Sequence, residues 1–202
     1  MTKTITRLFD DYADASAAVR DLETLGIFHD DLSIVANNSD SAHGDHDGVN
    51  DDGDVTRGVS TGAVLGGAGG LLAGLGLLAI PGLGPIVAAG WLAATAAGAG
   101  IGAAGGAATG GIVGALKNAG HSDEEANVYS EGVRRGGTLV SAKVPDDLVD
   151  QAEEVLDRNM AVDAQTRGTA YRQSGWSSFD ETAPNYTAAD VKRDRGLYTP
   201  TN

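Results

Sequence analysis

The sequence predicts an α+β fold, in which two β-α-β units form one ferredoxin-like domain that is interrupted by a glycine-zipper helical hairpin. Three observations lead to this prediction. Strand and helix patterns alternate in residues 1–36 and return in residues 117–165. The segment between them, residues 58–116, contains no Asp, Glu, Lys or Arg. Within that uncharged segment, glycine recurs at every fourth position in two separate runs.

Residues 1–36 are predicted to form the first half of the domain, in the order strand, helix, strand. Thr4–Phe9 is rich in β-branched and aromatic residues, which favour a strand. Apolar residues then recur at helical spacing over Ala15–Leu25, and Gly26 suits the left-handed position that follows a helix end. In Leu32–Ala36 the apolar residues alternate, as they do in a half-buried strand.

Residues 117–165 are predicted to form the second half of the domain. Ser122–Glu125 is a capping box that opens a helix. The elements that follow are a stop at Gly136, a strand at Val140–Val144, a helix through Leu148–Leu156 and a short strand at Val162–Ala164. Thr4–Ala36 and Thr138–Gln165 are thus two β-α-β units, which together supply the four strands and two covering helices of a ferredoxin-like domain.

Residues 58–116 are predicted to form the helical hairpin, because Ile80–Pro85 contains two prolines and two glycines and therefore favours a turn. Residues four apart lie on nearly the same helix face, so glycines at this spacing let a partner helix approach closely. Each glycine costs up to about 1 kcal/mol of helix propensity, which tight packing must offset. The predicted helix-packing residues are Gly58, Gly62, Gly66, Gly70, Gly74, Gly98, Gly102, Gly106, Gly110 and Gly114.

The sequence leaves open whether the hairpin packs in a lipid bilayer or against protein. Ser60–Ile80 has 21 residues, close to the roughly 20 that span a hydrocarbon core, which favours a transmembrane helix. Ile86–Leu116 is mostly Ala and Gly, which favours packing on the sheet or on another copy. The N-terminus lacks the apolar segment of a secretory signal. The predicted location is therefore the cytoplasm or the cytoplasmic side of the inner membrane.

Charge and residue content limit the function. The chain has 28 acidic and 14 basic residues, a formal net charge of −14, which argues against nucleic-acid binding. Residues 37–57 are predicted to be an acidic mobile loop. Within this loop His43–Asp47 contains imidazole and carboxylate groups that suit a divalent cation, although the spacing does not fit a calcium loop. The prediction is a solvated linker without a metal or a cofactor.

The sequence offers no catalytic signature. Gly67–Leu72 begins like a dinucleotide-binding fingerprint but lacks its third glycine, and no Gly-Lys-Ser or Gly-Lys-Thr occurs. His29 and His121 each precede acidic turn residues. No cysteine is present, which excludes thiolate chemistry. The chain is therefore predicted to be non-enzymatic, with no catalytic or cofactor-binding residues.

Three segments carry a resemblance to a known family. Arg7–Asp11, the glycine-rich central segment and Gly136–Ala142 are similar to bacterial general stress proteins, including those described as heat-induced or low-temperature-induced. The likeness covers about Thr4 to Gln165. It implies an accessory role in stress tolerance with no established biochemical activity.

Residues 166–202 scatter aromatic side chains through a polar segment, which predicts a disordered tail, with a docking peptide for a protein partner as the alternative. The resulting hypothesis is a non-enzymatic general stress-response protein that acts through membrane association, self-association of its glycine-zipper hairpin, or both. A homo-oligomer and contact with membrane lipid are the predicted partnerships. The alternative is a soluble small-molecule or protein-binding module in which the hairpin is only a packing element.

Overall fold

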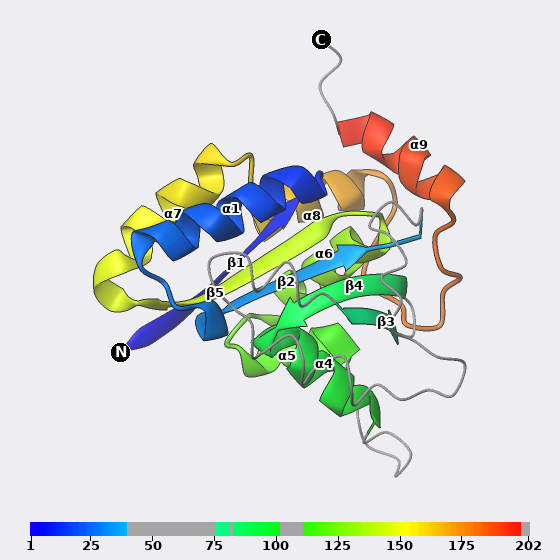
Figure 1. Cartoon of the computed structure of the whole chain (residues 1–202). Coiled ribbons are helices and arrows are strands. Elements are labelled where there is room, and N and C mark those ends of the chain that lie inside the picture. Colours follow the sequence, from blue (N-terminus) through cyan, green and yellow to red (C-terminus); the bar gives the residue numbers. More distant parts are fainter. Residues whose placement is uncertain (40–75, 81–82, 102–110, 199–202) are drawn as a thin grey trace.

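A computed structural model describes residues 1–39, 76–80, 83–101 and 111–198, and shows an antiparallel sheet with helices on both faces (Figure 1). The strands are β1 (Thr2–Phe9), β2 (Leu32–Asn37), β3 (Gly76–Ile80), β4 (Gly84–Gly90) and β5 (Thr138–Pro145). The helices are α1 (Tyr12–Leu25), α4 (Trp91–Ile101), α5 (Gly111–Asn118), α6 (Asp123–Arg134), α7 (Val149–Arg158), α8 (Ala164–Gln173) and α9 (Ala188–Tyr198). The predicted α+β class is confirmed.

The sheet joins strands from both halves of the sequence. Its order is β1-β5-β2-β4-β3, and each neighbouring pair is antiparallel. Strand β5 lies between β1 and β2, so that Ala142 is opposite both Ile5 and Leu32. On the outer side of β1, Leu8 forms a single bridge with Val162. The strand predicted at Val162–Ala164 is therefore reduced to one bridging residue, and Ala164 already begins α8.

Alternate residues of the strands point to opposite faces, and each face has its own core. On one face Ile5 and Phe9 pack with apolar residues of α1 and α7, among them Leu22 and Leu156. On the other face Leu8 packs with residues of α4, α5, α6 and α8. The helix signals near these cores are confirmed, because α1 ends at Gly26 with φ +102° and α6 begins at the Ser122–Glu125 capping box.

The predicted helix–turn–helix is wrong close to its turn, whereas α4 and α5, in the predicted second half of the hairpin, are helical. Gly76–Ile80 and Gly84–Gly90 are strands on either side of the turn, and β4 pairs with β2. Strand β2 is buried along its whole length, so it gains from a neighbour on each edge, and the β-branched Ile86 and Val87 suit that position. The last five residues of the predicted span Ser60–Ile80 are therefore extended rather than helical.

The glycines of the predicted zipper are described at only two of the ten positions. Gly98 lies in α4 and Gly114 lies in α5, and these two helices pack against each other. The other eight positions lie outside the described residues. Across the described ranges, no helix is long and apolar enough to cross a membrane.

Two further predictions need correction. The predicted disordered tail contains α8 and α9, so the prediction is wrong for the described residues 166–198. The predicted mobile loop begins too early, since Asn37 ends β2 and both Asn37 and Asn38 are buried. Most of that loop, including His43–Asp47, lies outside the described residues.

Candidate functional site

The candidate site starts from a buried carboxylate near the end of α6. Glu131 has a fully buried side chain, and a buried charge is costly unless it is paired. The Nε and Nη2 atoms of Arg134 donate to its two oxygens at 2.9 and 2.8 Å, and Nε of Arg135 donates to Oε1 at 2.6 Å. The i,i+3 and i,i+4 spacings place all three side chains on one side of the helix. We call Glu131, Arg134 and Arg135 the arginine cluster.

Aromatic rings cover the guanidinium groups of this cluster. The Arg135 guanidinium lies 4.4 Å from the ring centre of Tyr171 in α8 and 5.8 Å from that of Tyr186. The Arg134 guanidinium lies 5.1 Å from the ring centre of Tyr186 and 6.0 Å from that of Phe179. These positions are typical of cation–π contacts, which strengthen when the cation is partly removed from water.

Residues 174–198, here called the C-terminal segment, add a second carboxylate. Oδ2 of Asp194 in α9 accepts a hydrogen bond from Nη1 of Arg135 at 2.9 Å, and Asp194 is only 7% exposed. Burial disfavours the charged form of Arg135, but the hydrogen bond and charge of Glu131 and the charge of Asp194 outweigh it and raise the pKa of Arg135 above its ordinary value. Arg135 is therefore a fixed cation between two acidic partners.

The C-terminal segment touches the domain at few other points. The backbone N–H of Phe179 donates to Oδ1 of Asn127 in α6 at 3.1 Å. The Trp176 ring meets the Tyr171 ring edge-on, with 5.7 Å between their centres. From Arg172 to Asp190 no side chain is fully buried, whereas Val191 is 3% exposed. A small set of side chains therefore holds the segment in place.

Two glycines of α6 and its C-terminal end permit close packing. Gly136, just after the helix, faces Val191 of the C-terminal segment, and Gly132, within the helix, faces Leu8 of β1. A Cβ atom on Gly136, where φ is +99°, would overlap the Cγ1 atom of Val191. A Cβ atom on Gly132 would lie 2.5 Å from the Cδ2 atom of Leu8. Gly136 was predicted only to stop the helix, and the structure gives it a second role as the surface on which Val191 rests.

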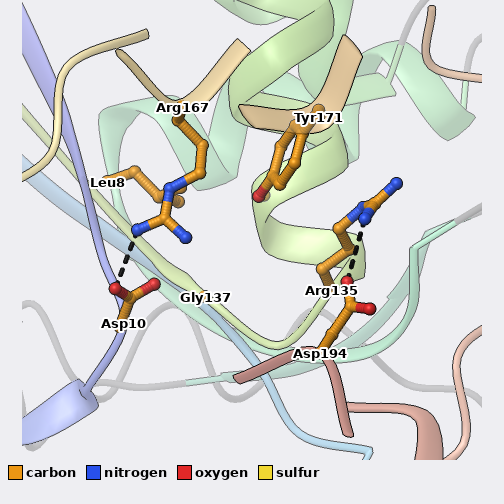
Figure 2. A pocket seen from close by; sticks show the side chains of 8 residues that line it. Leu8, Asp10, Arg135, Gly137, Arg167, Tyr171 and Asp194 are labelled. Atoms are coloured by element: carbon orange, nitrogen blue, oxygen red, sulfur yellow. Dashed lines mark hydrogen bonds and ion pairs between the residues drawn. The ribbon is translucent and has the colours of Figure 1, made fainter. Parts of the chain in front are cut away.

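A narrow cavity lies beside the cluster, between two ion pairs (Figure 2). On one side Nη2 of Arg167 donates to Oδ2 of Asp10 at 2.7 Å, and on the other side Arg135 binds Asp194. The Tyr171 side chain points between them in Figure 2. The space is about the size of a water molecule, so it does not admit an organic substrate.

A second polar group lies on the same face of the sheet and has the residue types of a catalytic triad. The Thr6 Oγ1 atom lies 2.7 Å from Nε2 of His121, and His121 Nδ1 lies 3.9 Å from a Glu125 oxygen. The Thr6 hydroxyl also lies 2.9 Å from Oγ of Ser141. However, Thr6 is 1% exposed, and its carbonyl accepts a hydrogen bond from the Tyr129 hydroxyl at 2.7 Å. A substrate cannot reach this hydroxyl, so the group holds β1, β5 and α6 together.

Burial also dominates the titration of this polar group. It lowers the pKa of His121 below its ordinary value, against the opposing charge of Glu125 and with a smaller contribution from Arg7. It raises the pKa of Tyr129 to about 12. Both side chains are thus held uncharged near neutral pH, which suits a structural role better than proton transfer.

Sequence reasoning did not identify the arginine cluster. Glu131 with arginines three and four residues later looks like an ordinary solvated helix surface, where ion pairs contribute little. The available signal was the aromatic content of the tail, since Phe179 and Tyr186 lie against the two arginines. Within the described ranges, no three His, Asp or Glu side chains gather as metal ligands.

Comparison of the chain with models of protein families, with curated proteins and with solved structures gives no match. The resemblance to bacterial general stress proteins therefore stays a prediction, and the geometry of the chain is the basis for assigning a function.

Proposed function

We propose that this chain is a non-enzymatic general stress-response protein that acts as a protein-binding module, with the arginine cluster as its binding surface. The observation that carries the proposal is that a few side chains of the arginine cluster and its neighbours bind the C-terminal segment. Arg135 binds Asp194, and aromatic rings cover both arginines, although most of the segment is exposed. A surface that holds a short peptide through a few strong side-chain contacts is what a peptide-binding module needs.

The body of this module is proposed to be ferredoxin-like. The order Val162, β1, β5, β2 and the position of α1 and α7 on one face support that assignment. The insert serves as a packing element, because Leu92 of α4 and Leu116 of α5 are fully buried in the core of the other face. Strands β3 and β4 extend the sheet beyond β2.

The absence of catalysis is part of the proposal. The Thr6–His121 pair is closed to substrate, and the cavity beside Arg135 holds about one water. The polar side chains at both places have hydrogen-bond partners that account for their burial: Tyr129 donates to the Thr6 carbonyl, and Arg167 donates to Asp10 beside the cavity. A cytoplasmic location, as the sequence predicts, suits such a module.

A labelled synthetic peptide of residues 174–202 tests the proposal by fluorescence anisotropy. Full-length Asp194→Ala should bind the peptide roughly tenfold more tightly than the wild type, because its own segment competes less, and a lost charged hydrogen bond is worth about 1.5–3 kcal/mol. Arg135→Gln should bind it far more weakly than Asp194→Ala. Failure of all three proteins to bind the peptide contradicts the proposal.

Self-association through the glycine zipper is a second candidate function. It is favoured by the packing of α4 against α5, two helices that include Gly98 and Gly114 of the second glycine run. Replacing Gly66 and Gly106 with leucine should then reduce oligomers in cross-linking experiments at equal expression. An unchanged ladder of cross-linked oligomers would reject the zipper.

A further inference from the structure

The connection between α8 and α9 has the features of a hinge. Residues 174–187 contain no helix or strand, and Gly175 directly after α8 has φ +90° with open space around it. Fourteen residues span roughly 45 Å when extended, which is comparable to the diameter of a domain of this size. The connection is therefore long enough to carry α9 to a neighbouring molecule.

The docking contacts of α9 are made by side chains, and Tyr186 of the connection adds its ring to the same two arginines, Arg134 and Arg135. Asp194 binds Arg135, and Val191 rests on Gly136. The same segment from another copy makes identical contacts, which is why exchange of an element between copies costs little. The balance between the two arrangements then depends on concentration, since a short flexible linker gives an effective concentration of the order of millimolar.

The charges of the site favour an occupied surface. With Asp194 in place, two carboxylates, Glu131 and Asp194, face two guanidinium groups, Arg134 and Arg135, and the charges cancel. When the segment leaves, the surface keeps one excess positive charge and exposes the Tyr171 ring. An acidic segment with an aromatic residue is the complement of this surface, and every copy of the chain supplies one.

We propose that two copies exchange their C-terminal segments, so that Asp194 and Val191 of each chain dock on Arg135 and Gly136 of the other in a reciprocal dimer. This proposal rests on the proposed function and names its partner, a second copy of the chain. The exchanged dimer should form as the concentration approaches the millimolar range, because its contacts are those of the closed monomer and only the effective concentration favours the monomer.

Two full-length variants test the exchange by complementation. Arg135→Gln has an altered surface and an intact segment, whereas Asp194→Ala has an intact surface and an altered segment. In a mixture, an intact Arg135–Asp194 pair forms only between one chain of each kind. Isotope labelling of one variant and native mass spectrometry should show heterodimers at least tenfold more abundant than either homodimer.

Control variants separate exchange from other effects. Lys192→Ala removes an exposed charge from the same helix and should leave dimer formation unchanged. If Arg135→Gln does not fold by circular dichroism, Asn127→Ala weakens the surface through its contact with Phe179 and replaces it in the mixture. Peptide binding without heterodimers overturns the exchange and leaves the proposed function standing. Loss of both peptide binding and heterodimers overturns both proposals.

Discussion

On one face of the sheet α1 and α7 cover an apolar core, whereas on the other face α4, α5, α6 and α8 enclose both apolar and charged groups. The first face is built from α1, which lies between β1 and β2 in the sequence, and α7, which follows β5. The second face collects helices from the insert, from the segment before β5 and from the region after α7 (Figure 1). Function is proposed on the second face because charged and aromatic side chains from distant segments meet there.

The largest effect is expected from a variant of the charged groups on the second face. Glu131→Gln should lower the free energy of unfolding by about 3–5 kcal/mol, because it leaves Arg134 and Arg135 as buried cations without their shared carboxylate. Glu124→Gln is the matched control, since Glu124 pairs with Arg172 on the exposed side of the same helix and should cost less than about 1 kcal/mol. Urea unfolding followed by circular dichroism measures both. Equal losses of unfolding free energy for the two variants would mean that the buried cluster stabilises the fold no more than an exposed ion pair does.

A pair of leucine truncations compares the apolar parts of the two faces. Leu156→Ala in α7 and Leu92→Ala in α4 each remove a fully buried side chain, and each should cost about 2–5 kcal/mol. A similar cost, with one cooperative transition in both variants, is expected if the insert is part of the core. A cost near zero for Leu92→Ala alone would show that α4 is not a packing element, and the zipper hypothesis would gain.

A pair of glycine substitutions tests how the C-terminal segment rests on the second face. Gly136→Ala and Gly26→Ala impose the same backbone strain, since φ is near +100° at both positions, but only the Cβ at position 136 collides with Val191. Gly136→Ala should therefore cost about 1–3 kcal/mol more than Gly26→Ala. It should also speed protease cleavage within residues 174–187. Unchanged cleavage would show that the Val191 contact does not hold the segment.

The two faces also differ in how far the sequence predicts them. The elements around α1, β2 and β5 follow from local signals, such as apolar periodicity and the left-handed glycine at position 26. These signals act within a few residues, so one sequence displays them. The position of β5 between β1 and β2 joins strands from both predicted halves in one sheet.

The insert and the arginine cluster depend on distant residues and were not predictable in this way. Gly84–Gly90 is short, apolar and glycine-bounded, a pattern that a helix and a buried strand share, and the open edge of β2 decides between them. The partners of Arg135 in the arginine cluster include Asp194 and Tyr186, more than 50 residues further along the chain. No spacing rule links such positions.

The smallest expected effect concerns the second polar group and appears as a pH dependence. Burial holds the pKa of His121 below its ordinary value, so the folded chain keeps a neutral imidazole beside Thr6 while the unfolded chain binds a proton near pH 6.5. The stability contributed by His121 is therefore fully present above the ordinary pKa. It is lost as the pH falls below that value toward the lower pKa of the folded state.

The measurement is the urea midpoint of the wild type and of His121→Gln between about pH 7.5 and pH 5, above the range in which most carboxylates titrate. Glutamine keeps a polar group near Thr6 but cannot take up a proton, so the variant should lack this part of the pH dependence. The difference between the two proteins should shrink as the pH falls, because only the wild type loses stability from protonation. The effect is small because Glu125 opposes the shift and the ring remains partly accessible. A parallel pH dependence in both proteins would mean that His121 is solvated in the folded chain. The inference that the Thr6–His121 contact is closed to solvent would then be wrong.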